Sequence, residues 1–147
     1  MNKKLQLLED VFADVAKKYA VIGVIGGSHT DEEGRTFGMA ELAAEHEFGD
    51  DKTGVPERSF LRSSLNENKE DYKEKLAALF RQAARGQAPA NNIYSTIGAV
   101  AAGNAQQKIQ SGELKPLKAA TIRRKGSSKP LIDTGQLVQS ITWDVRQ

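Results

Sequence analysis

The sequence predicts an α+β fold, with a small antiparallel or mixed sheet packed with an N-terminal helix and two long helices. Two segments, near residues 20–27 and 139–146, have the pattern of strands, and three have the apolar periodicity of helices. The chain has 147 residues and no cysteine. A chain of this length can bury a core as a single domain, residues 1–147, without disulfide bonds. Exposed loops are expected near 28–37, 49–58 and 113–134.

The N-terminal helix is predicted over about residues 2–18. Apolar side chains recur there at spacings of three and four residues, which places them on one stripe of an amphipathic helix. The next segment, YAVIGVIGG, is rich in β-branched residues and ends in Gly26 and Gly27, so it predicts a mostly buried strand stopped by a turn. The stripe that we expect to pack on the rest of the chain is Leu5, Leu8, Phe12, Val15 and Tyr19.

A polar loop and a short helix are expected next. Residues 28–37 are rich in polar and turn-forming residues, which is typical of an exposed loop or hairpin tip. Residues 39–48, MAELAAEHEF, contain good or tolerable helix formers, and Gly49 is suited to cap the C-terminal end of that helix. Gly54 and Pro56 then interrupt regular structure.

The two long helices are predicted over about residues 60–85 and 90–111. Apolar side chains recur at helical spacing in both, and a glycine follows the second where a C-terminal cap belongs. The centre of the second helix, GAVAAGNA, consists of small residues and includes two helix-weakening glycines, Gly98 and Gly103. We expect this small surface to let a neighbouring helix approach closely.

The segment before the last strand is irregular. Residues 117–124 favour a helical turn, and residues 125–129 favour a loop because Gly-Ser-Ser has neither apolar period nor β-branching. Asp133 or Thr134 is placed to cap a short turn that runs through Leu137.

The end of the chain has the pattern of a strand. Ile141, Trp143 and Val145 alternate with polar residues, which is the period of a strand with one buried face. We therefore expect Trp143 to be a core residue. The residues that we assign to the core in this part of the analysis are Phe60, Leu61, Leu137, Ile141 and Trp143.

Composition and motifs exclude several classes of function. Without cysteine, a disulfide framework, a thiolate metal site and a cysteine nucleophile are impossible. The longest strongly apolar run, residues 20–25, is too short to cross a membrane, and the N-terminus does not resemble a signal peptide, so we expect a soluble cytoplasmic protein. His29 and His46 lack the spacing of a zinc peptidase, and no glycine pattern matches a nucleotide-binding loop. We expect no enzyme activity, no cofactor and no metal.

Charge is distributed unevenly along the chain although the net charge is only +2. Residues 31–51 contain eight acidic side chains and one basic side chain, whereas residues 114–132 contain six basic and no acidic side chains. Such segregation steers one surface toward another, including that of a second copy of the chain. The basic stretch would also attract nucleic-acid phosphate, but base-stacking aromatic residues are missing around it.

Four stretches become informative when they are taken in order. They are VIGVIGGSHTDEEGRTFGMAELAAEHEFGD, GVPERSFLRSSL, PLKAATIRRKGSSKPLID and DTGQLVQSITWDV. Together they resemble the tail-completion and virion-morphogenesis proteins of tailed bacteriophages and prophages, a group that includes minor tail and neck proteins. The resemblance covers residues 21–145, and its last block is the most specific. The chain departs from the pattern at Ser59, where the family often has proline.

The resemblance implies a non-enzymatic structural protein of the virion, assembled in the cytoplasm of the bacterial host. Such a subunit self-associates into a ring at the neck, between the tail tube or tail terminator and the head connector, and meets DNA only in passing, in the lumen. Tail completion fits the blocks best, with tail terminator and head-closure protein as alternatives. From the residues alone, a small basic-loop nucleic-acid-binding module is the other hypothesis.

In this setting, we expect the acidic stretch around residues 41–51 of one subunit to meet the basic stretch around residues 118–129 of its neighbour. Head-to-tail contact between unlike surfaces is the kind that closes a cyclic ring. Residues 55–62 and the Gly-Ser-Ser loop are second candidates, for contacts with other neck or tail proteins. The predicted interface residues are Glu41, Glu45, Glu47, Asp50, Asp51, Arg58, Lys118, Arg123, Arg124, Lys125 and Lys129.

Overall fold

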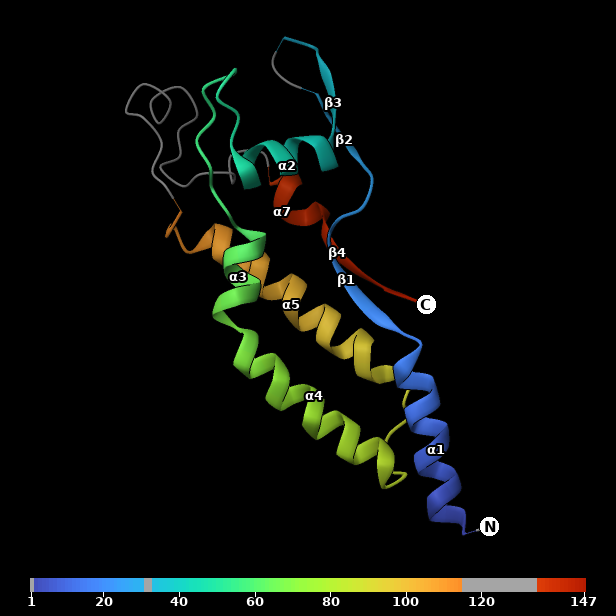
Figure 1. The fold of residues 1–147 in the computed structure, drawn as a ribbon. Helices are drawn as coiled ribbons and strands as arrows, with labels where there is room; N and C mark the ends of the chain where they lie inside the picture. Colours follow the sequence, from blue (N-terminus) through green and yellow to red (C-terminus); the bar gives the residue numbers. More distant parts are fainter. Residues whose placement is uncertain (1, 31–32, 115–134) are drawn as a thin grey trace.

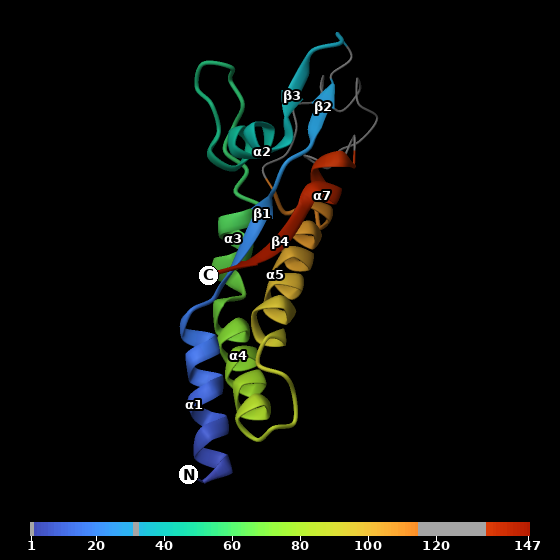
Figure 2. The same ribbon diagram turned by 90° about the vertical axis from the view of Figure 1, so that its right-hand side faces the viewer.

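A computed structural model describes residues 2–30, 33–114 and 135–147. These residues form an elongated α+β structure (Figures 1 and 2), which confirms the predicted fold class. None of the described helices is long and apolar enough to cross a membrane. In chain order the elements are α1 (Lys3–Ala16), β1 (Tyr19–Val24), β2 (Ser28–Thr30), β3 (Thr36–Gly38), α2 (Met39–Phe48), α3 (Leu61–Glu67), α4 (Lys69–Ala84), α5 (Asn92–Gln110), α7 (Gln136–Ser140) and β4 (Ile141–Arg146).

The central sheet joins the two strands predicted from the sequence. β1 pairs antiparallel with β4, so Ile22 lies opposite Trp143 and Val24 lies opposite Ile141. Directly opposite residues of an antiparallel pair point to the same face. Ile141 belongs to the main core, and the other three side chains are partly buried against it. The small hairpin β2–β3 forms a second sheet, at the tip predicted for residues 28–37.

The small centre of α5 receives a strand, which corrects the expectation of a helix there. A Cβ atom added at Gly98 would lie 3.0 Å from the Cβ and 3.1 Å from the Cδ2 of Trp143. Trp143 of β4 therefore packs directly on the α5 backbone. Its indole occupies the space beside Gly98 where we expected a neighbouring helix. Gly103 has no atom within 4 Å of an added Cβ.

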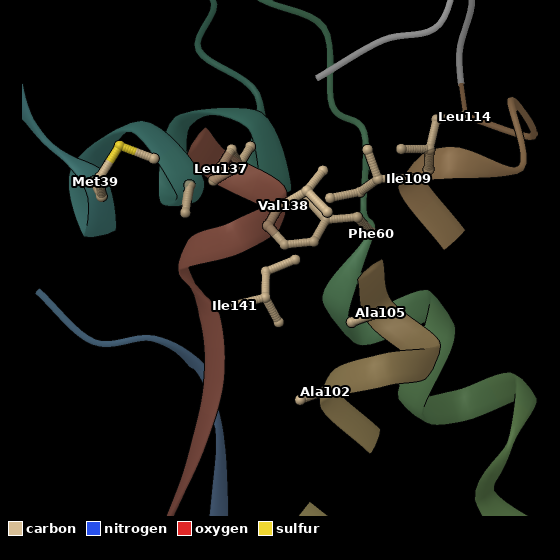
Figure 3. Close-up of a cluster of buried hydrophobic side chains, with 10 residues drawn as sticks. Met39, Phe60, Ala102, Ala105, Ile109, Leu114, Leu137, Val138 and Ile141 are labelled. Carbon is tan, nitrogen blue, oxygen red and sulfur yellow. The ribbon is translucent and has the colours of Figure 1, made fainter. Parts of the chain in front are cut away.

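Two apolar clusters stabilise the described chain. The larger one (Figure 3) gathers side chains from α2, α5, α7 and β4, from the residue before α3 and from Leu114 after α5. The smaller one lies where α1, α4 and α5 meet. Of the predicted core residues, Phe60, Leu137 and Ile141 are buried, and Leu61 and Trp143 are half-buried against the same cluster. The larger cluster is Met39, Ala43, Phe60, Ala102, Ala105, Ile109, Leu114, Leu137, Val138 and Ile141.

The first predicted long helix is two helices. α3 ends at Glu67 and α4 begins at Lys69, with Asn68 between them at φ −99° and ψ 7°. The side-chain amide of Asn68 donates to the Ser64 carbonyl oxygen over 2.8 Å. This local hydrogen bond competes with the helical backbone, which is why asparagine favours helix ends over helix interiors.

The face of α1 that packs on the chain differs from the predicted stripe. Its buried residue is Val11, and Leu7 and Val15 pack beside it on α4 and α5. Three residues of the predicted stripe, Leu5, Phe12 and Tyr19, are more than half exposed.

Most of the segment between α5 and α7 for which the sequence makes predictions lies outside the described residues. The helical turn at 117–124, the loop at 125–129 and the capping role of Asp133 or Thr134 therefore stay predictions. A short helix, α7, does run through Leu137.

Candidate interaction surface

The acidic surface is built on α2 and the loop that follows it. Met39, Ala43 and Glu47 recur every four residues and are buried, so they share the face of α2 that packs on the core. Glu41 is exposed and Glu45 is half-buried. In Figures 1 and 2, α2, this loop and the β2–β3 hairpin lie at one end of the molecule, and the N-terminus lies at the other.

Gly49 turns the chain back over α2. Its φ of 73° is in the left-handed region, which glycine adopts without strain. A Cβ there would lie 2.7 Å from the backbone nitrogen of Glu57 and 3.1 Å from the Val55 carbonyl oxygen. Glycine at this position therefore satisfies both the helix end and the close approach of the loop.

The loop is held to α2 by hydrogen bonds. Asp50 and Val55 form an antiparallel bridge, with N–H···O distances of 2.8 and 3.1 Å. The Thr53 hydroxyl donates to Glu45 Oε1 over 2.8 Å. Asp51, at the turn of this loop, is exposed. These hydrogen bonds fix the backbone of the loop that carries Asp50 and Asp51.

Glu47 connects α2 to the start of α3 from within the structure. Its side chain is 6% exposed and accepts hydrogen bonds from the Ser59 hydroxyl at 2.8 Å and the Leu61 backbone N–H at 2.9 Å. It also accepts from Arg62, through the backbone N–H at 3.0 Å and Nε at 2.8 Å. Burial by itself raises the pKa of Glu47, but these hydrogen bonds outweigh it and hold the pKa below its ordinary value.

Arg62 extends this arrangement to the surface. Its Nη2 donates to the Glu47 carbonyl oxygen at 3.1 Å and to Glu57 Oε1 at 2.8 Å. The hydrogen bond with Glu47 raises the pKa of Arg62 above its ordinary value. The guanidinium lies 4.4 Å from the ring centroid of Phe48, which is 61% exposed, in a cation–π arrangement. Phe48 and Arg62 therefore form a positioned apolar and cationic pair beside the acidic residues.

An open hollow of about 480 Å³ lies between α2 and the loop. Leu42 and Ala44 are among the residues that line it, and the charged residues of the lining are all acidic. A lining with both apolar and acidic side chains suits a basic segment whose aliphatic stems contact the apolar residues while its charged groups meet the carboxylates. The lining residues are Glu41, Leu42, Ala44, Glu45, Gly49, Asp50 and Thr53.

The structure corrects two of the predicted interface residues. Glu47 is 5% exposed, and its carboxylate is used within the chain. Arg58 is 7% exposed, and its burial lowers the pKa of its guanidinium. Because both side chains are buried within their own chain, we remove both residues from the predicted interface. Glu41 and Asp51 are exposed, Glu45 and Asp50 are half-buried, and all four stay predictions.

The basic residues of the predicted contact lie outside the described residues. They are Lys118, Arg123, Arg124, Lys125 and Lys129.

The residues that sequence reasoning missed are Phe48 and Arg62. Phe48 follows three acidic side chains at the end of a helix, and nothing in the local period separates an exposed aromatic residue from a buried one. A signal for Glu47 did exist: it falls four residues after Ala43 and eight after Met39, on the apolar row of α2.

Within residues 2–30, 33–114 and 135–147, no group of three or more metal-ligating side chains is found. Comparison of the chain with protein-family models, with curated protein sequences and with solved structures found no match.

Proposed function

We propose that the chain is a non-enzymatic structural protein of a tailed phage or prophage, a tail-completion or neck ring subunit that joins the tail to the head connector. The proposal starts from the ordered sequence blocks that resemble this family. In the virion, such a subunit would contact its own copies in the ring and the neighbouring neck and tail proteins.

The observation that carries the proposal is that blocks far apart in the sequence contact one another. Glu47, from the first block, accepts hydrogen bonds from Leu61 and Arg62 of the second. β1, also from the first block, pairs along its length with β4, from the last block. Segments that depend on one another physically are expected to recur together, which supports treating the blocks as one resemblance.

The mechanism that we propose for ring closure is electrostatic. The α2 surface with its exposed Glu41 and Asp51 is acidic, and the sequence from 114 to 132 carries six basic side chains and no acidic ones. When the basic stretch of one subunit meets the α2 surface of the next, each subunit uses both surfaces once, and the head-to-tail contact can close a ring.

Charge reversal tests this contact. We expect Arg123→Glu combined with Arg124→Glu to weaken self-association, measured by light scattering at low salt. Adding Glu41→Lys and Asp51→Lys should restore it, because opposite charges then face each other again. The matched control adds Glu70→Lys and Glu74→Lys instead, which changes the net charge equally but on the exposed side of α4. Unchanged self-association in the arginine double variant, or equal rescue by the control, would overturn the proposed contact.

A further inference from the structure

A second, smaller hollow lies between α3, α5 and the residues that follow α5. Its volume of about 170 Å³ is room for about five water molecules. α3 packs on the C-terminal half of α5 at this place (Figure 1), where α3 contributes Ser64 and Glu67 to the lining and α5 contributes Asn104 and Lys108. Every residue that lines this hollow has a polar side chain, so its occupant is expected to be polar as well.

Two asparagines of the lining have the nitrogen ends of their amide groups engaged within the chain. The Asn68 amide nitrogen donates to the Ser64 carbonyl oxygen over 2.8 Å, and the Asn104 amide nitrogen donates to the Tyr72 hydroxyl over 2.9 Å. The oxygen end of an amide group is an acceptor only. Neither amide oxygen accepts a hydrogen bond from the described residues, so both remain acceptors for a ligand.

The ammonium group of Lys108 is engaged too. Its side chain is 13% exposed, and Nζ donates to Glu67 Oε1 at 2.7 Å and to Glu113 Oε2 at 2.9 Å. These hydrogen bonds raise the pKa of Lys108 above its ordinary value. Glu67 and Glu113 are 57% and 63% exposed, so their carboxylates can accept further hydrogen bonds. Two carboxylates and one ammonium group leave the lining with a net negative charge.

Ser64 adds a hydroxyl group without a partner. The residue is 1% exposed, and its Oγ makes no hydrogen bond with the described residues. A buried polar group that lacks a hydrogen bond costs free energy on folding, and such a group in a native structure calls for an explanation. A polar ligand in the hollow beside Ser64 is such an explanation, and it is independent of the charges at the rim.

We propose that this hollow binds a guanidinium group, the side-chain end of an arginine from a partner protein. A guanidinium group is positively charged, offers five N–H donors in a planar fork and accepts no hydrogen bond. It therefore matches a lining whose charge is negative and whose amide oxygens and carboxylates are acceptors. The small volume admits the end of the side chain and leaves the backbone of the partner outside, beside Glu67 and Glu113.

Two other cations match the lining less well. A divalent ion such as Ca²⁺ also binds to carboxylate and amide oxygens, but here it would lie beside the ammonium group of Lys108, which repels it and already uses both carboxylates. A primary ammonium group is a compact charge with three donors, so it offers fewer hydrogen bonds to the same acceptors. None of the residues of this hollow belongs to the proposed ring contact, so the inference does not rest on the proposed function.

Titration of the full, isotope-labelled chain with propylguanidinium at low salt tests the site. The side-chain amide signals of Asn68, Asn104 and Gln107 in proton–nitrogen correlation spectra should shift and saturate. Propylurea, a neutral molecule of similar shape, should shift them little. A blocked glycine-arginine-glycine peptide should shift the same signals, and the corresponding lysine peptide should bind several-fold more weakly. No saturable shift with propylguanidinium, or tighter binding of Ca²⁺ or of the lysine peptide, would overturn the proposal.

The same titration distinguishes the source of the group. Binding of propylguanidinium without binding of the arginine peptide would assign the hollow to a free small cation and overturn a partner's arginine as the ligand.

Substitutions locate the binding. Glu113→Gln removes one carboxylate of the rim and should weaken the binding of propylguanidinium several-fold. The matched control is Glu70→Gln, which changes another exposed glutamate that is paired with a lysine but lies on α4 and does not line the hollow. Ser64→Ala should also weaken binding, because the unpartnered hydroxyl is lost. Equal affinities of Glu113→Gln and Glu70→Gln would show that the ligand binds elsewhere.

Discussion

Replacing Glu47 with glutamine separates a structural role for this carboxylate from a role at a surface. Oε1 accepts from Ser59, Arg62 N and Arg62 Nε, and Oε2 accepts from the Leu61 N–H. Glutamine keeps an oxygen at the first position but places an NH₂ group against the Leu61 N–H. The substitution therefore leaves one buried donor unpaired and removes the charge from the remaining hydrogen bonds.

We expect Glu47→Gln to lower the free energy of unfolding by about 2–3 kcal/mol, from an unsatisfied buried donor and the weaker neutral hydrogen bonds. For a domain of this size, each kcal/mol lowers the melting temperature by about 2–4 °C. The assay is urea unfolding followed by the fluorescence of Trp143, which is the only tryptophan of the chain. The matched control is Glu57→Gln, which alters an exposed acceptor of the same Arg62 and should cost at most about 1 kcal/mol.

The pH dependence follows from the lowered pKa of Glu47. A carboxyl group whose pKa is lower in the folded than in the unfolded state contributes stability that is present above the unfolded pKa and lost as pH falls through the folded pKa. The stability difference between the natural protein and Glu47→Gln should therefore be full at pH 7 and shrink below about pH 4. A difference no larger than that of Glu57→Gln, or one that is equal at pH 7 and at pH 3, would refute the reasoning.

Four further substitutions test the packing. Gly98→Ala should destabilise by about 1–3 kcal/mol, because its Cβ would lie 3.0 Å from Trp143, whereas Gly103→Ala, with open space around it, should stabilise by up to about 1 kcal/mol through helix propensity; thermal unfolding of the pair checks both signs. Gly49→Ala should destabilise by at least about 1 kcal/mol, measured by urea unfolding, since φ is positive and the loop backbone is in the way. Ser64→Ala should leave the melting temperature unchanged or raise it, because this buried hydroxyl has no hydrogen-bond partner among the described residues.

The spacing of apolar residues in the sequence predicted the elements that pack on the core with one face only. Ile141, Trp143 and Val145 alternate with polar residues because only one face of β4 packs on α5, and this pattern appears directly in the sequence. The pairing of β1 with β4, which are more than a hundred residues apart, brings both strands to the same core. The break at Asn68 was missed because Leu65 and Tyr72, on either side of it, are seven residues apart and so keep the phase of one helix. The competing side-chain hydrogen bond of Asn68 is a local preference that periodicity does not report.

The row that α1 buries was not predictable for a different reason. An apolar arc wider than one neighbouring layer contains more than one possible stripe, and only the positions of α4 and α5 decide that Val11, rather than Phe12, is buried.

The candidate site was predictable in part. Acidic residues gather in residues 31–51 of the sequence, and Glu41 and Asp51 are indeed exposed. Glu47 was misassigned because a carboxylate is expected at the surface unless partners are known. Those partners, Leu61 and Arg62, come from the start of another helix, so their convergence is a tertiary property.

The most direct test of a charge-closed ring is the mass of the protein in solution, measured by light scattering over a concentration series at low and high salt, with a duplex-DNA titration of the same sample. The account predicts species heavier than a dimer at low salt, which dissociate at high salt, and no appreciable affinity for DNA. A protein that never exceeds a dimer and binds DNA with an affinity that falls steeply with salt would contradict it, because counterion release from phosphate would then explain the basic stretch.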